Sequence, residues 1–428
     1  MSYLWLAYAK ETFKVKKKDM KREIKMDFPT EITQEGNVKV LVPKLRAFVT
    51  SASEYAPSKA PVFYNPVMEL NRDIAVLALQ AYQRMLNSEV SVCEPLAGCG
   101  IRGVRFAVEV EGVKKVIIND INVKAFQLSS RNVQMNQLGD HVFLKNEDAN
   151  FLLSRYGAPR KRFDAIDIDP FGSPAPYLDS AIRALRNGGL LALTATDMAP
   201  LCGVHPKACI RKYGGKPLRT EYCHELAVRL LAGCVAMTAA KYDMGIGILF
   251  SHSVNHFVRL YTAIKHGAKK ADRNIGNMGY VYHCFKCFHR EPAKGLLLAN
   301  GYVKCSECGS KISVAGPLWL GKIFDRHFCE LLEEETNQRT FKHKKRILKI
   351  LGLIKNEVDA PITYYVVDKL CDALSLPVPS VRRVVEALRE KGFQASLTHF
   401  NSRGIRSNAS AIEMKELVRE IIGSSGKF

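Results

Sequence analysis

Short apolar runs alternate with helical segments between residues 90 and 195, and this alternation constrains the fold more than any other feature. Strands are predicted at 90–93, 115–118, 142–144, 165–168 and, after a turn at 187–189, 190–195, with helices at 103–110 and 125–135. Strands that alternate with helices form a parallel sheet covered by helices. The predicted fold class is therefore α/β, with a doubly wound sheet. Two later apolar runs, at 247–251 and 257–264, are expected to add an antiparallel hairpin at the sheet edge.

The chain is long enough, at 428 residues, for two or three domains. Residues 1–28 are rich in lysine and are expected to form a basic, disordered N-terminal extension, with Met20 and Met26 as alternative starts. The α/β domain is predicted to occupy 29–270, where the strand and helix pattern ends in a charged stretch. Residues 271–428 are then expected to form a C-terminal α+β domain.

The C-terminal domain is expected to contain a cysteine-rich segment at 280–315, a charged helix at 322–351 and a final module. The final module has predicted helices at 362–374 and 380–391, then two strand-like runs at 394–399 and 404–407. This order predicts a winged-helix-like module, with the two runs as the wing. The second helix carries an apolar stripe of Val381, Val384, Val385 and Leu388, and basic residues off that stripe, Arg382, Arg383, Arg389 and Lys391.

The net charge of +21, from 63 Lys and Arg against 42 Asp and Glu, indicates a polyanionic partner such as nucleic acid. A merely solubilising surface is the alternative. No apolar run approaches the roughly 20 residues that span a bilayer, so membrane attachment is not expected. The apolar N-terminal residues precede the lysines, which is the reverse of a signal peptide. Twelve cysteines, mostly at irregular spacing, indicate a reducing compartment, and a cytoplasmic location is predicted.

The stretch 163–172 ends a buried strand in a carboxylate, a proline, an aromatic ring and a glycine. Because Pro170 cannot donate to a strand ladder, the strand is expected to stop at Asp169. Open α/β sheets bind their ligands at the carboxyl ends of their strands. Asp169 is therefore the candidate catalytic residue, while Asp164 and Asp167 are alternatives that strand alternation disfavours. A purely structural interpretation is that Asp169 caps the following turn.

A carboxylate beside a backbone carbonyl and a ring suits the binding of a planar amine. The exocyclic amine of a nucleobase is a poor nucleophile because its lone pair is delocalised into the ring. Asp169 is expected to orient such an amine and to accept its proton. The carbonyl of Pro170 can accept the second N–H, and Phe171 can stack on a base that has left its helix. The motif thus predicts methyl transfer to the amino group of a base.

The loop after the first strand has the pattern Gly98-x-Gly100-x-x-Gly103, whose glycines let a ligand approach the backbone. About twenty residues on, Asp120 closes the second strand, where an acid can bind ribose hydroxyls. A dinucleotide-dependent dehydrogenase shares both features, and a tight turn with solvated acids is a third interpretation.

Further residues favour S-adenosylmethionine as the cofactor. Glu94 directly follows the first strand, and Arg102 lies inside the loop, where it can meet a methionine carboxylate. Asp148 and Ala149 follow the third strand, where the edge of an adenine would lie.

Two cysteine pairs, Cys284-x-x-Cys287 and Cys305-x-x-Cys308, are separated by seventeen residues. This spacing presents four thiolates to one metal ion and predicts structural Zn²⁺, since no position remains open for chemistry. An iron centre and a pair of disulfides are the alternatives. His283 and His289 are expected to be solvated or to face RNA, and the other eight cysteines to be core or incidental.

A set of motifs extends from about residue 35 to the C-terminus. They are Val62-Phe63-Tyr64-Asn65-Pro66, Leu70-Asn71-Arg72-Asp73, Gly98-Cys99-Gly100-Ile101-Arg102-Gly103, Asp169-Pro170-Phe171-Gly172-Ser173-Pro174, Thr194-Ala195-Thr196-Asp197, Pro200-Leu201-Cys202-Gly203 and Thr398-His399-Phe400. Together they resemble one family, the tRNA (guanine-26-N2)-dimethyltransferases, especially the archaeal members. The wider amino-methyltransferase pattern has two prolines before its aromatic residue, so the single Pro170 fits this family and disfavours a DNA-adenine enzyme.

The resemblance implies a class I (Rossmann-like) S-adenosylmethionine-dependent methyltransferase domain followed by a family-specific C-terminal domain. The implied reaction transfers one or two methyl groups to N2 of a tRNA guanosine at the junction of the D and anticodon stems. Asp169 would be the catalytic acceptor, and Phe63 and Phe171 would sandwich the guanine. The implied cofactor contacts are Arg72, Arg102, Asp120, Asp148 and Ala149.

The expected partner is tRNA, and no obligate protein partner is inferred. Binding is expected to be shared between the two domains, with phosphates held by the basic residues at 382–391 and by Lys342, Lys344, Lys345 and Arg346; a solvated helix face is the alternative. Two other functions remain open from the residues. One is an N2-guanine or N6-adenine methyltransferase acting on rRNA or DNA. The other is a non-catalytic zinc and winged-helix RNA-binding protein with an inactive methyltransferase domain.

Overall fold

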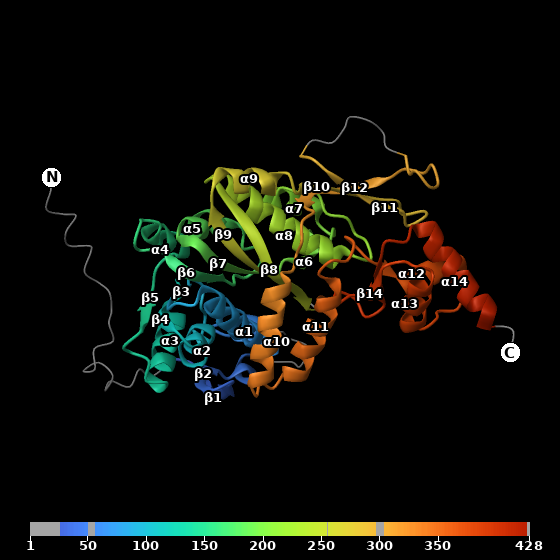
Figure 1. Cartoon of the computed structure of the whole chain (residues 1–428). Coiled ribbons are helices and arrows are strands. Elements are labelled where there is room, and N and C mark those ends of the chain that lie inside the picture. The colour runs from blue at the N-terminus through green and yellow to red at the C-terminus, as the bar shows by residue number, and fades with distance from the viewer. Residues whose placement is uncertain (1–25, 50–55, 255, 297–303, 426–428) are drawn as a thin grey trace. The chain divides into compact units, whose positions relative to one another are not determined.

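The computed structural model describes residues 26–49, 56–254, 256–296 and 304–425 (Figure 1). Up to residue 25, the predicted N-terminal extension lies outside the described residues. The chain forms two compact units and passes between them more than once. Unit 1 contains the described residues up to Asp169, together with Asp179–Ala192 and Leu331–Ile347. Unit 2 contains Pro170–Leu178, Leu193–Glu330 and the chain from Leu348 onward.

A seven-stranded sheet confirms the predicted α/β class. In sheet order its strands are β5 (Val142–Lys145), β4 (Val113–Asn119), β3 (Val90–Glu94), β6 (Phe163–Ile168), β7 (Leu185–Ala195), β9 (Phe257–His266) and β8 (Met244–Val254). The pairs from β5 to β6 are parallel, while β8 and β9 form the expected antiparallel hairpin at the edge. The strand order reverses between β3 and β6, and doubly wound sheets bind ligands at such a reversal.

The turn predicted at 187–189 is wrong, because these residues lie inside β7. Gly188 has a φ of +83°, a backbone conformation that glycine adopts at little cost, so the chain can bend there without leaving the strand. The hydroxyl of Tyr82 donates to the carbonyl of Gly188 at 3.1 Å and holds this bend.

Unit 1 is completed by a hairpin and by helices. The elements are β1 (Thr30–Glu35), β2 (Val38–Pro43), α1 (Glu69–Leu86), α2 (Ile101–Glu109), α3 (Val123–Met135) and α4 (Ala149–Tyr156). Two of these helices begin at side-chain caps, which satisfy backbone N–H groups that lack a partner at a helix start. Asn122 accepts from the N–H of Lys124 at 2.9 Å, and Asp148 accepts from that of Phe151 at 2.9 Å. The short helix α5 spans Leu178–Arg183.

The first helices of unit 2 follow β7 along the chain. They are α6 (Met198–Leu201), α7 (Pro206–Tyr213), α8 (Cys223–Ala240) and α9 (Ala268–Ile275). Among the described helices, α8 alone is long and apolar enough to cross a membrane by length and composition. Since 72% of that helix is buried inside the structure, it has the environment of a core helix.

A three-stranded sheet follows, with the order β11-β10-β12. Its strands are β10 (Met278–His283), β11 (Arg290–Lys294) and β12 (Ser313–Trp319). The single charged helix predicted at 322–351 is wrong, because the chain forms α10 (Arg326–Gln338) and α11 (Lys344–Glu357) instead. Between them Phe341 is buried, with the guanidinium of Arg105 5.1 Å from the centre of its ring. The helix is interrupted where this ring packs into unit 1.

The final module has the order β13 (Tyr365–Val366), α12 (Val367–Leu374), α13 (Val381–Glu390), β14 (Ala395–Leu397), β15 (Gly404–Ser407) and α14 (Ala411–Ser425). The two predicted wing strands pair antiparallel, and β15 lies between β13 and β14. The helix predicted at 362–374 begins later, because 365–366 pair with β15. The apolar stripe of α13 is buried in the module's core, as its spacing predicts.

Candidate functional site

Asp169 directly follows the last residue of β6, at the carboxyl end of a strand whose residues are all buried. Its side chain is 19% exposed, so solvent or a ligand can reach it. Asp164 and Asp167 are both buried, and Asp164 accepts hydrogen bonds from the backbone N–H and hydroxyl of Ser91. Of the three candidate carboxylates, Asp169 is the one that lies at the end of the strand and can be reached by solvent or a ligand.

Arg102 on α2 lies against a group of carboxylates at this tip. Its Nη2 donates to Oδ2 of Asp169 at 2.5 Å. Its Nη1 lies 3.3 Å from Asp167 and 3.5 Å from Glu94. Arg102 was predicted to meet a cofactor carboxylate, and its contact with Asp169 was not predicted because the two residues are 67 positions apart.

Glu94 is fully buried at the end of β3. Its Oε2 accepts from the N–H of Gly103 at 2.8 Å and so fixes the start of α2 to the strand. Burial raises the pKa of Glu94 to about 8, although Arg102 opposes the shift, while Asp167 and Asp169 add to it. The three carboxylates therefore exceed the single arginine in negative charge, and Glu94 relieves part of this excess by holding a proton at neutral pH.

The glycine loop has the close approaches that its sequence predicts. Gly98 and Gly100 have φ values of +54° and +71°, which favour glycine. A Cβ on Gly100 would lie 2.7 Å from Oγ of Ser129, and one on Gly103 would lie 2.5 Å from the Ile118 side chain. The loop therefore packs directly on β4 and α3.

Two acids border this loop as predicted. Asp120 follows β4, and its Oδ2 accepts from the N–H of Gly98 at 2.8 Å. Asp148 is exposed at the N-cap of α4, and Ala149 behind it is buried. A partly exposed carboxylate beside a glycine loop and a second one at a helix start fit the hydroxyl and base contacts of a nucleoside.

Arg72 on α1 has a partner that sequence analysis did not identify. Its Nε donates to Oε2 of Glu35, at the end of β1, at 2.7 Å. Its Nη2 also donates to the carbonyl of Asn65 at 3.1 Å, and the hydroxyl of Tyr64 donates to Glu35 at 3.1 Å. These bonds tie the segment that carries Phe63 to α1 and β1.

The aromatic residues predicted to bind a base lie in contrasting environments. Phe63 is half-buried, and its carbonyl accepts from Sγ of Cys99 in the glycine loop at 3.2 Å. The side chain of Phe171 is 76% exposed, and Pro170 before it is buried. The N–H of Gly172 donates to Oγ1 of Thr196 at 2.7 Å, which attaches the loop after Asp169 to the end of β7.

The four predicted metal ligands come together in the structure. The sulfur atoms of Cys284, Cys287, Cys305 and Cys308 all lie within 4.8 Å of one another. The sulfurs of Cys284 and Cys308 are 3.5 Å apart and those of Cys287 and Cys305 are 3.4 Å apart, which is much longer than a disulfide of about 2.05 Å. Hydrogen bonds from Ser310 lower the pKa of Cys308 to about 6, toward the thiolate that binds metals. The donor set fits tetrahedral Zn²⁺.

The two histidines near this cluster behave differently. His289 lies 3.0 Å from Glu307 and 3.2 Å from the hydroxyl of Ser306, so it braces the second cysteine pair. The prediction that His283 is solvated or faces RNA is wrong. His283 is fully buried and packs edge-on against the rings of Phe285 and Tyr222.

The basic residues predicted to hold tRNA are mostly exposed. On α13 these are Arg382, Arg383 and Arg389, and Lys391 is the C-cap of that helix. Lys391 is paired with Glu420, and Arg389 donates to the carbonyl of Ala395 at 3.0 Å. Lys345 and Arg346 are exposed on α11, while Lys342 pairs with Glu69 at 3.1 Å and Lys344 donates to the carbonyl of Asn337 at 2.8 Å.

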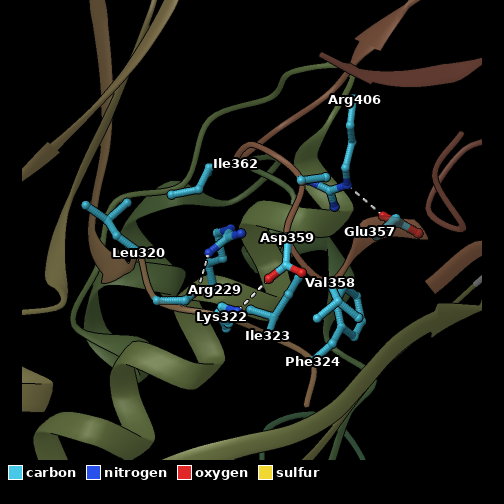
Figure 2. A pocket seen from close by; sticks show the side chains of 12 residues that line it. Arg229, Leu320, Lys322, Ile323, Phe324, Glu357, Val358, Asp359, Ile362 and Arg406 are labelled. Carbon is cyan, nitrogen blue, oxygen red and sulfur yellow. Dashed lines mark hydrogen bonds and ion pairs between the residues drawn. The ribbon is translucent and has the colours of Figure 1, made fainter. Parts of the chain in front are cut away.

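A buried ion network in unit 2 was not predicted (Figure 2). Arg406 on β15 donates from Nε to Glu357 at 2.6 Å and pairs through Nη1 with Glu225 of α8 at 2.9 Å. Glu357 also accepts from the hydroxyl of Thr398 at 2.6 Å and from the backbone of His399 at 2.7 Å. The motif at 398–400 thus joins the final module to α11, next to a pocket that Arg406 and Glu357 line.

Comparison with known proteins decides which family this geometry belongs to. A sequence model of the family described as N2,N2-dimethylguanosine tRNA methyltransferase matches residues 36–419. The chain belongs to this family. A tRNA (guanine(26)-N(2))-dimethyltransferase from Methanobrevibacter smithii is 41% identical over 399 residues, covering 93% of this chain and 100% of that protein. A tRNA (guanine(26)-N(2)/guanine(27)-N(2))-dimethyltransferase from Aquifex aeolicus is 39% identical and covers 91% of this chain and 96% of its own length.

Membership of the N2,N2-dimethylguanosine tRNA methyltransferase family also agrees with a solved structure. The complex of Trm1 from Pyrococcus horikoshii with S-adenosyl-L-methionine superposes with a TM-score of 0.79 at 35% identity, covering 90% of this chain and 99% of that one. The resemblance stated from the motifs is therefore confirmed, and so is the Rossmann-like methyltransferase fold.

Proposed function

We propose that this chain transfers one or two methyl groups from S-adenosyl-L-methionine to N2 of a guanosine in tRNA, at the guanine-26 position that its relatives' names give. The observation that carries the proposal is Asp169, an accessible carboxylate at the carboxyl end of β6, beside the strand-order reversal where ligands bind. Its neighbours Pro170 and Phe171 complete a motif suited to an amine on an aromatic base.

In the proposed reaction, S-adenosyl-L-methionine supplies an electrophilic methyl group when bound. Asp169 accepts a hydrogen bond from the guanine N2 amine and aims its lone pair at that methyl. As the N–C bond forms, the amine becomes cationic and Asp169 takes its proton. Arg102, whose Nη2 donates to Oδ2 at 2.5 Å, holds the carboxylate in one orientation.

The base would be held by the residues around Asp169. The carbonyl of Pro170 would accept the second N–H, and the rings of Phe63 and Phe171 would stack on the guanine. Phe171 directly follows Pro170 and its ring is 76% exposed, which supports this role because the ring lies at the surface next to the proposed amine-binding groups.

The cofactor would be bound by residues of unit 1. Asp120 would bind the ribose hydroxyls and Asp148 with Ala149 the adenine, while Gly98 and Gly100 let the backbone approach. Arg72, Glu94 and Arg102 would hold the methionine end. The excess negative charge around Arg102 supports this assignment, because S-adenosyl-L-methionine carries a sulfonium and an ammonium cation and a single carboxylate.

The final module would act as a winged-helix module that contacts tRNA phosphates. Its order of elements, its β13-β15-β14 sheet and the exposed basic residues of α13 support this role. Residues 29–270 would form the catalytic domain and 271–428 the tRNA-binding domain. The two compact units divide the chain differently, since Pro170–Leu178 and residues 193–270 belong to unit 2 and Leu331–Ile347 belongs to unit 1. A four-cysteine Zn²⁺ site at 280–315 would stabilise the tRNA-binding domain, and the enzyme would act in the cytoplasm.

The proposal is tested by incubating the full chain with unmodified tRNA, rRNA or DNA and labelled S-adenosyl-L-methionine, followed by nucleoside analysis. We expect N2-methylguanosine or N2,N2-dimethylguanosine in tRNA, lost when guanosine 26 is replaced by adenosine. Label in rRNA or DNA with unlabelled tRNA would assign the second candidate function. No label in any substrate, from protein that still binds the cofactor, would favour the non-catalytic candidate.

A further inference from the structure

A second group of metal-ligating side chains lies in unit 2, apart from the four cysteines. Ligand atoms of Cys202, Cys223 and His224 all lie within 4.8 Å of one another. Cys202 is the C-cap of α6, and Cys223 is the first residue of α8, so the fold brings together residues from two helices. We propose that these three side chains bind a second thiophilic divalent ion, with Zn²⁺ as the natural candidate.

The donor set is one that zinc uses in proteins. Two cysteines and one histidine, with water in the fourth position, form a known tetrahedral arrangement. Zn–S bonds of about 2.3 Å and Zn–N bonds of about 2.0–2.1 Å place ligand atoms of a tetrahedron roughly 3.5–4 Å apart. The observed limit of 4.8 Å therefore needs only small side-chain rotations. All three residues are partly exposed, so an ion can reach them from solvent.

The position of Cys223 favours the thiolate that a metal requires. It begins an α-helix of 18 residues, and the partial positive charge at a helix N-terminus stabilises an anion. His224 follows it directly, so one turn of backbone supplies two of the three ligands. Cys202 supplies the third, and Cys202 and Cys223 are both free of disulfide bonds in this structure.

An ion at this site would join α6 to α8 beside the substrate-binding motif. The chain leads from Thr196, which accepts from the N–H of Gly172 at 2.7 Å, through Asp197 into α6. Asp197 in turn accepts from the hydroxyl of Tyr213 at 2.5 Å. An ion that fixes the end of α6 to α8 would therefore also hold the end of β7 in place. The loop after Asp169 is attached there, through the bond between Gly172 and Thr196. The ion would act by joining the two helices, with its fourth position left to water.

Metal counting on the full chain tests this inference. Protein purified under reducing conditions without chelator should contain close to two zinc ions per chain, one at each site. Cys202→Ser should lower the count to one, and so should a Cys305→Ser/Cys308→Ser variant that retains this cluster. Cys234→Ser is the matched control, because Cys234 is a partly exposed cysteine on α8 outside the cluster, and its count should stay at two.

A second measurement covers variants that fail to fold. In wild-type protein stripped of metal, Co²⁺ titration should show two binding steps with sulfur-to-cobalt absorption, and His224→Asn should weaken one step at least tenfold. The inference is overturned if the wild-type chain binds one ion and Cys202→Ser does not change the count. A Cys202–Cys223 disulfide found by mass spectrometry in the reduced preparation, with no second metal step, would overturn it equally.

Discussion

Arg102 serves three carboxylates at once, and this arrangement determines how the charge beside Asp169 is balanced. Its side chain is 4% exposed, so its attraction for Asp169, Asp167 and Glu94 is poorly screened by water. Asp169 is 19% exposed whereas Glu94 is fully buried, and burial raises the pKa of Glu94 to about 8. A raised pKa favours the protonated form of Glu94 near neutral pH, while Asp169 keeps its contact with Arg102 and is the proposed proton acceptor.

Replacing Asp169 by asparagine tests its proposed role directly. The amide preserves the shape and an acceptor oxygen for Arg102, but it cannot accept the amine proton. We expect turnover to fall by about 10²–10⁴-fold, the usual contribution of a general base, with affinity for S-adenosyl-L-methionine within a few-fold of wild type. Single-turnover methylation and calorimetry measure the two quantities. Turnover above about a tenth of wild type would exclude the role, and Asp164→Asn, at the other end of β6, is the control.

Glu94→Gln should change the pH dependence of stability. An unfolded glutamate titrates near pH 4.5, whereas the folded pKa is about 8. Between these values the folded state holds a proton that the unfolded state has released. The stabilising contribution is therefore complete below about pH 4.5 and is lost as the pH rises through 8, by up to about 1.4 kcal/mol per pH unit.

Glutamine does not titrate and can still accept from the N–H of Gly103. The stability of Glu94→Gln relative to wild type should therefore increase between pH 5 and pH 8, as measured by urea unfolding. Glu89→Gln is a suitable control, because Glu89 is exposed and paired with Lys114 on the surface. A difference between Glu94→Gln and wild type that stays constant with pH would show that Glu94 is ionised throughout.

At the scale of elements, local patterns predicted most of the sheet and the tips of its strands. The strand from 163 to 168 is buried throughout and is followed by Asp169 and Pro170. The end of the strand and the position of Asp169 could therefore be predicted from the sequence. The glycine loop could be read because each glycine satisfies a local steric requirement. The partners of Arg72 and Arg102 could not be predicted, because Glu35 and Asp169 lie far from them in the sequence. A positive charge alone does not indicate which of the many acidic residues it will contact.

The break between α10 and α11 illustrates a second limit of sequence patterns. Residues 322–351 have helical composition throughout, and the interruption follows from the packing of Phe341 against Arg105 in unit 1. Likewise, Thr398 and His399 were recognised as a motif without a role. Their role became visible only with Glu357, which they contact from 41 and 42 positions away.

The network around Arg406 should be a major source of stability for unit 2. Arg406, Glu357 and Glu225 are almost fully buried, and the attraction of His399 and Arg406 overcomes burial to lower the pKa of Glu357 to about 2. Arg406→Met leaves two buried carboxylates without their shared cation. We expect the free energy of unfolding to fall by about 3–5 kcal/mol, measured by urea denaturation.

Arg403→Met is the matched control for Arg406→Met. Arg403 lies in the same module and pairs with Asp368 at 2.8 Å. In contrast to the Arg406 network, these two side chains are 34% and 42% exposed. Exposed pairs contribute about 0–1 kcal/mol, so this variant should be nearly as stable as wild type. Equal losses in the two variants would mean that burial does not set the strength of the Arg406 network.

At the scale of the whole molecule, the charge of +21 should govern how tRNA is bound. If α13 holds phosphates, a variant with Arg382, Arg383 and Arg389 replaced by glutamine loses up to three such contacts. Each lost contact should flatten the slope of log affinity against log salt by about 0.7–0.9. We expect weaker tRNA binding at low salt and a smaller slope, measured by filter binding at several salt concentrations.

Glu386→Gln/Glu390→Gln provides the control for this variant, because both acids are exposed on the same helix. Removing them should leave affinity unchanged or slightly higher. Wild-type affinity and slope in the triple arginine variant would show that α13 is only a solvated face and that tRNA is held elsewhere.

The return of Leu331–Ile347 to unit 1 has a consequence for how the protein is made. Within that unit Arg84 pairs with Glu335 at 3.0 Å, and Arg339 donates to the carbonyl of Glu109 at 2.7 Å. A ribosome that has synthesised the chain through residue 270 has therefore released every predicted catalytic residue, but not the helix that covers α1 and α2. Unit 1 is completed only when the chain through Ile347 has been made, which is 77 residues beyond residue 270 (347 − 270), a delay of about 4–15 seconds at roughly 5–20 residues per second. During that interval we expect α1 and α2 to lack their contacts with Leu331–Ile347, so completion of unit 1 depends on translation of residues far beyond the predicted catalytic ones.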